Sequence, residues 1–412
     1  MKILQINNCH YRRGGADVVY LNTGKLLEKF GNEVVYFSQL SKQNKNTKYD
    51  KYFIKEKDFF KMNIIKKIKN FFSFFFSIES YNKICKLIEN ERPDIAHIHL
   101  YRGILTPSIL YPLKKNKIPI VITLHDYNML CPHYCFLNGK NEICELCING
   151  AYFNCVTNKC NRNNLLFSSI TYLEYIYHKK IFPFSSYFDR MICVSKFSFE
   201  KHINTYLPHE KLSHLYNFIP NLDKLQFNDK KGDYILYFGR LSFEKGIITL
   251  LNSWLQKKRK TKLYVVGTGS EKNKIEEKIN GCSSVNLLGF KEGEELENLI
   301  KNCSFVIVPS EWYENNPLTV LEAYAYGKPV AGSKVGGIPE IVDDNSTGFL
   351  FEMKNENQLS ALIDKIELMS DTEYQTFSNN ARKFAEKYFD EESHYIKLIY
   401  LYNNSIDNYK NN

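Results

Sequence analysis

The sequence has no apolar run that approaches the roughly 20 residues needed by a membrane-spanning helix. It also shows no secretory signal peptide, because the strand-length run from Lys2 to Asn7 is followed by polar residues. Eleven cysteines without such a signal indicate a reducing cytosol, where free thiols or a metal site are more common than disulfides. We therefore expect a cytoplasmic protein.

Motifs for nucleic-acid binding are missing too: there is no recognisable helix-turn-helix, zinc finger or RNP-like sequence. No D-x-D motif is present to suggest a catalytic divalent metal. The net charge of +10 is uneven, because residues 1–222 hold 31 Lys and Arg against 17 Asp and Glu, whereas the remainder holds 24 against 28. A basic half indicates contact with an anionic surface. Without nucleic-acid motifs, the expected surface is a membrane.

Strand-like and helix-like segments alternate along the 412 residues, which are enough for two domains with cores of their own. Strands are expected at 3–6, 33–37, 95–98, 118–124, 191–194, 234–238, 262–266, 285–288, 305–308 and 329–331. Such alternation predicts an α/β fold in which two doubly wound domains have parallel sheets covered by helices. We expect the domains at 1–222 and 230–390, and a C-terminal helix at about 391–412 that completes the first domain.

The stretch 305–348 carries the strongest functional signal. Its strand leads into a polar loop, and Pro317 suits the first position of a helix expected to end near Tyr326. Glu314 in the loop and Glu322 in the helix stand eight residues apart at the edge where open α/β sheets bind ligands. Phosphates on the free N–H groups of the helix start, with sugar hydroxyls on the carboxylates, would satisfy both features. A solvated acidic loop is the alternative interpretation of so loose a pattern.

Loops after other expected strands also fit a phosphate-bearing ligand. Gly14-Gly15 precedes a helix and would let a phosphate approach the backbone, although it is not a G-x-G-x-x-G motif. Arg240 and Lys245 follow a strand and could neutralise a diphosphate leaving group. Small residues at further strand ends could form the walls of a nucleotide pocket: Gly239, Gly267, and Gly289 with Phe290.

With these features, the chain resembles the retaining glycosyltransferases of the GT-B fold, in the large family 4. The motif PSEWYENNPLTVLEAYAYGKPVAGS, followed by GGIPEIV and STGFL, carries a resemblance that covers nearly the whole chain. The resemblance implies two Rossmann-like domains facing across a crevice, with Arg240 and Lys245 on the donor diphosphate and Glu322 on the ribose. It implies that the donor sugar is held by Glu314 and by the backbone of Asn315, Asn316, Pro317 and Leu318. His125 falls where the family has a histidine beside the donor sugar, although a histidine at a strand end is more often structural.

The implied function is transfer of a sugar from a nucleoside-diphosphate sugar to a hydroxyl of a glycan or lipid-linked acceptor, as in capsule or other cell-surface polysaccharide assembly. No catalytic cofactor is implied, and front-face attack would proceed with the departing diphosphate helping to deprotonate the acceptor. An epimerase of the same fold is the alternative. The chain departs from the family at Asn315-Asn316, where Gly followed by Phe or Tyr is common, and at Phe218, where Gly often follows Asn217.

Two further segments carry expectations of their own. The insertion at 131–160 holds six cysteines, and four of them have a spacing that could hold one structural Zn²⁺: Cys144, Cys147, Cys155 and Cys160. Residues 59–78, FFKMNIIKKIKNFFSFFFSI, place phenylalanines on one helical face and lysines on the other. That pattern predicts a peripheral anchor on an anionic membrane, the alternative being a helix that buries its phenylalanines in the core.

Overall fold

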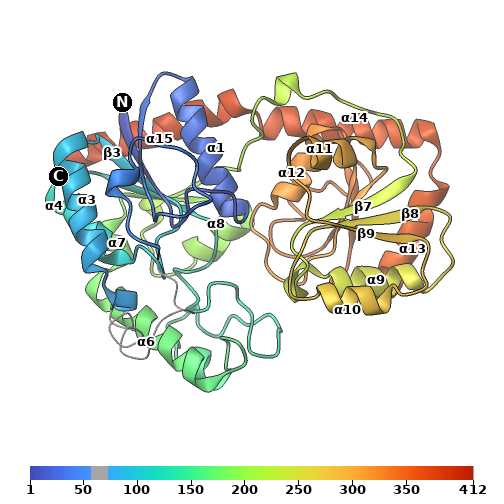
Figure 1. Ribbon diagram of the computed structural model, residues 1–412, viewed down its shortest axis with the longest axis horizontal. Helices are drawn as coiled ribbons and strands as arrows, with labels where there is room; N and C mark the ends of the chain where they lie inside the picture. The colour runs from blue at the N-terminus through green and yellow to red at the C-terminus, as the bar shows by residue number, and fades with distance from the viewer. Residues whose placement is uncertain (57–72, 412) are drawn as a thin grey trace. The chain divides into compact units, whose positions relative to one another are not determined.

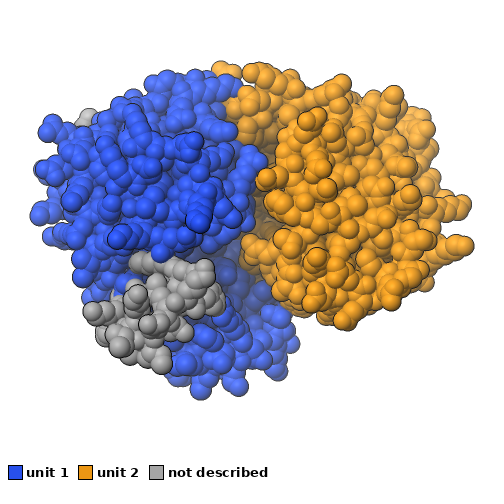
Figure 2. Space-filling view, in the orientation of Figure 1, with its two compact units in different colours: residues 1–215, 394–412 blue, residues 216–393 orange. Residues whose placement is uncertain are grey.

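The protein was studied as a computed structural model, which describes residues 1–56 and 73–411 (Figure 1). The chain divides into two compact units, coloured separately in Figure 2. Unit 1 comprises residues 1–215 and 394–412, and unit 2 comprises residues 216–393. Each is described by itself.

Unit 1 is built on a six-stranded sheet in which every paired strand is parallel. Its strands are β1 (Lys2–Ile6), β2 (Glu33–Phe37), β3 (Ile95–Ile98), β4 (Ile120–Leu124), β5 (Arg190–Cys193) and β6 (Leu212–His214), in the spatial order β2-β1-β3-β4-β5-β6. Its helices are α1 (Gly15–Lys29), α3 (Ile78–Glu91), α4 (Leu110–Lys115), α5 (Asn154–Thr157), α6 (Leu165–Ile181), α7 (Phe184–Tyr187) and α8 (Lys196–Ile203). The C-terminal helix α15 (Glu391–Asn411) ends in this unit.

The C-terminal helix α15 covers one face of this sheet, and the alternation of side chains along the strands shows which residues lie under it. One core cluster combines Ile3, Ile95 and Val121 from neighbouring strands with Leu398 and Tyr402 of α15. Because every second residue of a strand lies on the same face, Gln5, His97 and Thr123 share that face. The sequence thus places three polar side chains under α15.

Unit 2 contains a second six-stranded parallel sheet. Its strands are β7 (Tyr234–Phe238), β8 (Lys262–Val266), β9 (Val285–Gly289), β10 (Val306–Val308), β11 (Val330–Ser333) and β12 (Gly348–Phe351), in the order β12-β11-β10-β7-β8-β9. Its helices are α9 (Ile247–Leu255), α10 (Lys272–Lys278), α11 (Gly293–Asn302), α12 (Leu318–Ala325), α13 (Glu356–Leu368) and α14 (Asp371–Tyr388).

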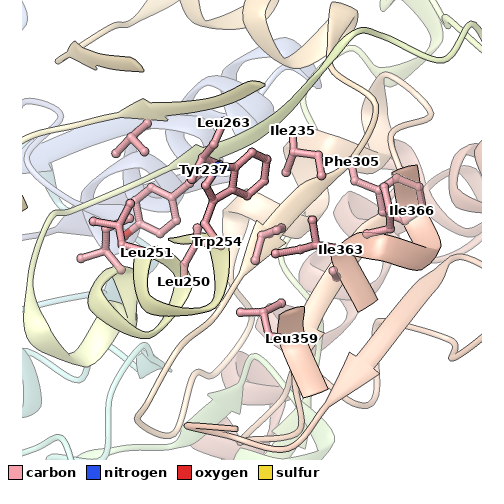
Figure 3. Packing of buried hydrophobic residues seen from close by; sticks show 14 of the residues in the cluster. Ile235, Tyr237, Leu250, Leu251, Trp254, Leu263, Phe305, Leu359, Ile363 and Ile366 are labelled. Atoms are coloured by element: carbon pink, nitrogen blue, oxygen red, sulfur yellow. The ribbon is translucent and has the colours of Figure 1, made fainter. Parts of the chain in front are cut away.

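The core of unit 2 forms where strands meet the helices α9 and α13 (Figure 3). Trp254 of α9 is fully buried there, and its indole N–H donates to Ser284 Oγ at 3.0 Å. Phe305 and Ile363 pack in the same cluster. This core supports the ends of β7 and β10, which carry the expected site.

The two-domain α/β expectation is confirmed, and two short strands were missed. β6 has three residues, and β12 begins at Gly348, a residue that favours a turn in sequence-based interpretation. In the structure a Cβ on Gly348 would lie 1.9 Å from the Val330 carbonyl oxygen. Close approach to β11 therefore requires glycine at this position.

Residues 216–222, expected in the first domain, lie in unit 2. The Arg382 guanidinium of α14 donates to the Leu222 carbonyl at 2.8 Å, and Ile219 forms a parallel bridge with Asp390. These backbone contacts fix the segment to unit 2 ahead of its first strand.

Most of the expected membrane anchor, residues 59–72 of the segment 59–78, lies outside the described residues. The described end of the segment packs within unit 1: the Phe75 carbonyl accepts from His178 Nε2 at 2.8 Å, and the Phe76 ring stacks on Phe182. Among the described helices, none combines the length and the apolar character needed to cross a bilayer.

Candidate functional site

The strand order of unit 2 places its switch point between β7 and β10. Counting strands within the unit, the order is 3-2-1-4-5-6, so chain connections leave in opposite directions from these two neighbours. Ligands of open α/β sheets bind beyond the carboxyl ends of the strands at such a point. The loops that follow β7 (239–246) and β10 (309–317) hold the candidate residues Arg240, Lys245 and Glu314.

Lys245 and Glu314 form an ion pair across the switch point. Lys245 Nζ lies 2.6 Å from Glu314 Oε1, and Ser310 Oγ donates to the same oxygen at 2.6 Å. Glu314 is only 5% exposed. Burial alone would raise the pKa of its carboxyl, but the Lys245 ammonium outweighs it and holds the pKa below the usual value. Two residues 69 positions apart thus form one charged centre.

Arg240 is the exposed cation of the same loop, with 62% of its side chain accessible and Glu244 Oε1 3.8 Å from its guanidinium. Its backbone is fixed more firmly, because the Tyr237 hydroxyl donates to the Arg240 carbonyl at 2.8 Å. Ser242 Oγ donates to Glu244 Oε1 at 2.6 Å. The loop therefore presents an exposed guanidinium on a tethered backbone.

Glycines bring the loops of this edge into direct backbone contact. A Cβ on Gly246, which has φ +68°, would lie 1.7 Å from the Pro309 carbonyl oxygen. Gly267 (φ +140°) approaches Gly239 as closely, with 1.9 Å to its carbonyl oxygen. The structure thus gives Gly267 a loop-packing role, whereas Gly289 is open and Phe290 is 65% exposed.

The loop 310–317 is fastened from three sides. Ser333 Oγ donates to the Ser310 carbonyl at 2.7 Å, and the Gly337 N–H donates to the Glu314 carbonyl at 2.7 Å. From unit 2's first segment, the Asn217 N–H donates to Asn316 Oδ1 at 2.9 Å. Asn217 therefore positions the loop, a role that a sequence pattern could not reveal.

The Asn316 side chain has one satisfied end and one unsatisfied end. Its Oδ1 accepts from Asn217, while its buried Nδ2 has no hydrogen-bond partner among the described residues. Asn316 is 6% exposed. A buried donor without an acceptor is unfavourable, so this amide is suited to a ligand oxygen.

Helix α12 begins at Leu318, with Pro317 as the flanking N-terminal residue, one position later than expected. It ends at Ala325, and Gly327 follows with φ +71°, as the sequence predicts. Glu322 lies in this helix and is half-buried.

Sequence reasoning missed Glu311, a 4% exposed carboxylate between the same loops. Thr249 Oγ1 of α9 donates to Glu311 Oε1 at 2.5 Å, and the Glu311 N–H donates to the Glu244 carbonyl at 2.8 Å. In the sequence, Glu311 is marked only by its place in the loop beside Trp312. That place does not distinguish a buried carboxylate from a solvated one.

Unit 1 has its own switch point, between β1 and β3. The Asn7 side chain joins the two sides: its Oδ1 accepts from the Leu100 N–H at 3.1 Å, and its Nδ2 donates to Asp17 at 2.8 Å. Asp17 is in the first turn of α1, which starts at Gly15 with Gly14 as its N-cap. The expected glycine pair therefore lies at a helix start on the switch-point edge, with a buried carboxylate beside it.

His125 follows β4 in unit 1 and is half-buried. Its Nε2 lies 2.9 Å from Nδ1 of His99, which follows β3, and the two rings stack at 5.2 Å. Burial lowers the pKa of His125 to about 3, so the ring is neutral near pH 7.

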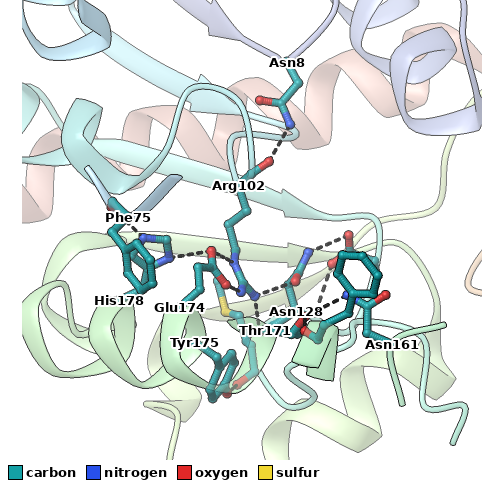
Figure 4. A network of polar contacts seen from close by, with 12 residues as sticks. Asn8, Phe75, Arg102, Asn128, Asn161, Thr171, Glu174, Tyr175 and His178 are labelled. Atoms are coloured by element: carbon teal, nitrogen blue, oxygen red, sulfur yellow. Dashed lines mark hydrogen bonds and ion pairs between the residues drawn. The ribbon is translucent and has the colours of Figure 1, made fainter. Parts of the chain in front are cut away.

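A buried ion pair anchors the loop that contains His125 (Figure 4). The Arg102 guanidinium binds both Glu174 oxygens, one of them at 3.2 Å, and donates to Asn128 Oδ1 at 2.6 Å. Asn128 Nδ2 in turn donates to Asp126 at 2.8 Å. Burial raises the pKa of Glu174, but Arg102 and His178 together lower it to about 2.

The expected zinc site receives no support. Among the described residues, which include all of the cysteine-rich insertion, no group of three or more His, Cys, Asp or Glu could hold a metal ion. All eleven cysteines are free, and burial raises the pKa of Cys131 and Cys147 to about 12. As a correction, Cys144, Cys147, Cys155 and Cys160 form no metal centre in this structure.

Two family models match the chain along most of its length. The model of Glycosyltransferase Family 4 matches residues 13–221, and that of Glycosyl transferases group 1 matches residues 219–384. The chain belongs to the family of glycosyltransferases that these two models describe. Neither model describes an epimerase, so that alternative has no support.

Individual proteins agree with this assignment. An uncharacterised glycosyltransferase of Methanocaldococcus jannaschii is 27% identical over 339 residues, covering 79% of this chain and 88% of the relative. The O-antigen biosynthesis glycosyltransferase WbnH of Escherichia coli is 29% identical over 180 residues, covering 43% of this chain and 50% of WbnH. The crystal structure of HepE from Anabaena, in complex with UDP and glucose, has a TM-score of 0.68 and 16% identity, covering 98% and 100% of the two chains. That likeness shows the GT-B fold.

Proposed function

We propose that this glycosyltransferase moves a sugar from a nucleoside-diphosphate sugar, with retention of configuration, to a hydroxyl of a glycan or lipid-linked acceptor in cell-surface polysaccharide assembly. The observation that carries the proposal is the Lys245–Glu314 pair at the switch point of unit 2, in the same loop as the Asn316 side chain, whose Nδ2 has no partner among the described residues. HepE, bound to UDP and glucose, and WbnH, named for O-antigen biosynthesis, support a donor and a pathway of these kinds.

The charged centre has the chemistry that a departing diphosphate needs. Lys245 carries three N–H donors, so it can keep Glu314 and still donate to a phosphate oxygen. Arg240 is exposed on a tethered backbone and can move onto the same diphosphate. The two cations stabilise the negative charge that develops on the diphosphate as its bond to the sugar breaks. Glu314 and Asn316 hold sugar hydroxyls. Glu322, half-buried in α12, is assigned to the ribose.

Retention would follow from front-face attack, in which the diphosphate oxygen accepts the proton of the acceptor hydroxyl. Positioning and electrostatics are then the protein's contribution. Proton NMR of the first-formed product tests this: the anomeric configuration of the donor is expected, and an inverted anomer would refute retention.

The donor is tested by thermal shift with UDP, UDP-glucose and a panel of other nucleoside-diphosphate sugars. A ligand that binds only the native state stabilises it by about 2.7 kcal/mol at a ligand concentration of 100 times Kd, and this stabilisation raises Tm. A uridine donor is expected to raise Tm in the wild type and to lose most of that shift in Lys245→Ala. If no nucleotide in the panel raises Tm, the assigned diphosphate site is wrong.

Helix α6 supports a membrane-facing acceptor. Its outward side exposes large apolar side chains, with Leu166 67%, Leu173 52% and Ile181 53% exposed, and Lys180 lies among them. The basic charge of residues 1–222 is complementary to an anionic leaflet, which gains about 1 kcal/mol from each lysine close to its surface. We therefore assign unit 1, through this face and the segment 59–78, to the inner face of the cell membrane.

Flotation with anionic liposomes tests the assignment. The variants are Leu166→Glu with Leu173→Glu, and Lys66→Glu with Lys67→Glu and Lys69→Glu. Both are expected to reduce flotation at low salt, and equal flotation of wild type and variants would contradict membrane docking. A pair of Lys→Glu changes in unit 2, at the exposed Lys272 and Lys274, is the control for net charge.

A further inference from the structure

A continuous set of polar side chains crosses the sheet of unit 1 and ends at His125. The Tyr402 hydroxyl of α15 lies 2.6 Å from His97 Nδ1, and Gln5 Nε2 lies 3.4 Å from the same nitrogen. Gln5 Oε1 is 3.0 Å from His99 Nε2, and His99 Nδ1 is 2.9 Å from His125 Nε2. We call these five residues the histidine relay.

All of the relay is buried except its last member. Gln5 and Tyr402 are 0%, His97 1% and His99 2% exposed, whereas His125 is half-buried. Strand pairing sets the order, because Gln5 on β1 is in register with His97 on β3 and both lie under α15. The relay thus carries a structural constraint from the core to a ring at the ligand edge.

Hydrogen-bond donors and acceptors determine the tautomers on the side of His125. The Gln5 carbonyl oxygen can only accept, so His99 Nε2 carries the hydrogen. A neutral imidazole has one N–H, which leaves His99 Nδ1 as an acceptor. His125 must then donate from Nε2 to His99, and its own Nδ1 is the acceptor nitrogen.

The side of Tyr402 gives a consistent result. The Tyr402 hydroxyl, 2.6 Å from His97 Nδ1, can donate to this nitrogen, and the hydrogen of His97 is then on Nε2. That nitrogen lies 2.7 Å from Thr123 Oγ1, which accepts it. Burial lowers the pKa of His97 to about 3 and that of His99 well below its usual value, which keeps both rings neutral. Both ring nitrogens of His97 and of His99 then have a partner of the right kind.

We propose that Gln5, His97, His99 and Tyr402 are positioning residues that hold His125 in one orientation as the neutral Nε2–H tautomer, with Nδ1 as its acceptor nitrogen at the ligand edge of unit 1. The proposal deepens the proposed function and rests on it, because the orientation of His125 affects sugar transfer only if this residue acts in that reaction. It also gives the C-terminal helix a structural role, because this helix brings Tyr402 to His97, a residue 305 positions earlier in the chain.

Long-range proton–nitrogen NMR of the full chain with ¹⁵N-labelled histidine reads the tautomer without any ligand. The His125 signals are identified by their loss in His125→Ala. At pH 7.5 the wild type is expected to show a protonated Nε2 and an unprotonated Nδ1 at His125. A protonated Nδ1, or rapid exchange between the tautomers, overturns the proposal.

Two substitutions at one position separate positioning from packing. His99→Leu removes the acceptor, whereas His99→Gln keeps an acceptor for His125 and a donor for Gln5. The tautomer of His125 is expected to become mixed in His99→Leu and to be restored in His99→Gln. If His99→Leu does not fold, Gln5→Leu breaks the relay at the next link and is expected to give the same mixing. An unchanged His125 in the folded variant overturns the proposal.

Turnover is measured as UDP release from UDP-glucose. His99→Leu is expected to lower kcat about 10- to 100-fold, the loss found when outer partners of metal-bound histidines are removed, while His99→Gln stays within about threefold of wild type. The affinity for UDP is expected to remain unchanged in both, because the diphosphate residues belong to unit 2. Equal kcat in all three proteins overturns the relay's role in positioning. Full activity of His125→Ala would instead show that His125 takes no part in sugar transfer, and it would leave the tautomer result intact.

Discussion

The two units have closely related sheets and opposite chemistry at their switch points. In unit 2 the loops after β7 and β10 meet through the Lys245–Glu314 ion pair. In unit 1 the residues after β1 and β3 meet through amides and imidazoles, and all ten histidines of the chain lie in that unit. The edge of unit 2 is built on an ion pair, whereas the imidazoles at the edge of unit 1 are neutral.

Burial acts differently on the two edges because their partners differ. Glu314 is buried yet ionised, since Lys245 lies 2.6 Å away and outweighs the cost of desolvation. His97 and His99 are buried and His125 is half-buried, and their relay contains no carboxylate, so desolvation lowers each pKa and the rings stay neutral. Burial alone therefore does not set the charge of a site.

Arg102→Met gives the largest expected effect, because it leaves Glu174 buried without its guanidinium partner. Breaking a buried pair from one side costs about 3–5 kcal/mol of unfolding free energy. Urea unfolding of unit 1, followed by NMR of its histidines, is the measurement. The double variant Arg102→Met with Glu174→Met should recover much of the loss, and a single-variant loss below about 1 kcal/mol would contradict the ion pair.

Lys245→Ala is expected to lower glycosyl transfer more than about 100-fold, or roughly 3 kcal/mol of transition-state stabilisation. Arg240→Ala should have a similar effect on transfer with less effect on stability, because its side chain is exposed. Lys272→Ala, in an exposed pair on α10, is the matched control and should leave transfer unchanged. Near-wild-type turnover in both site variants would contradict the diphosphate assignment.

Gly337→Ala is expected to destabilise unit 2 by about 2 kcal/mol and to weaken binding of UDP. The new Cβ would lie 1.9 Å from the Asn315 carbonyl oxygen, so the loop that carries Glu314 must shift. Gly289→Ala is the control: it has φ +71° but open space around it, so only strain of about 1 kcal/mol is expected. Thermal unfolding with and without UDP measures both, and equal effects would show that the contact is unimportant.

The smallest effect concerns His10, whose Nδ1 lies 2.8 Å from the Tyr20 hydroxyl. Burial, aided by Lys45, lowers its pKa from 6.5 to about 4. Between those values the unfolded chain binds a proton that the folded chain does not, so acidification lowers stability by about 1.4 kcal/mol per pH unit.

His10→Gln should reduce the slope of unit 1 by up to about 1.4 kcal/mol per pH unit between pH 6 and 5, measured by urea unfolding at each pH, and the slope that remains comes from other buried histidines such as His97 and His125. Glu314 behaves oppositely in sign: its pKa is lowered below 4.5, so its contribution is present above that pH and is lost only in stronger acid. Unit 2 should therefore lack this response from Glu314 between pH 6 and 5. An unchanged slope in His10→Gln would show that other groups carry the effect.

Much of the fold could be predicted from the sequence, because its causes are local. Apolar runs of strand length, such as 234–238 and 262–266, correspond to β7 and β8 residue for residue. Pro317 and Gly327 mark the ends of α12 to within a residue. β12 was not predicted, because glycine at position 348 is required by the close contact with Val330 and not by a local preference for a strand.

The sequence by itself determined which residue types stand at strand ends, and this is enough to make Arg240, Lys245 and Glu314 candidates. Only the tertiary structure decided what they contact, because hydrogen bonds between loops 69 positions apart depend on strand order. The same holds for Glu311, for Asn217 and for the relay from Tyr402 to His125. Their partners lie on other strands and helices, and a hydrogen bond forms only after packing has brought both groups out of water.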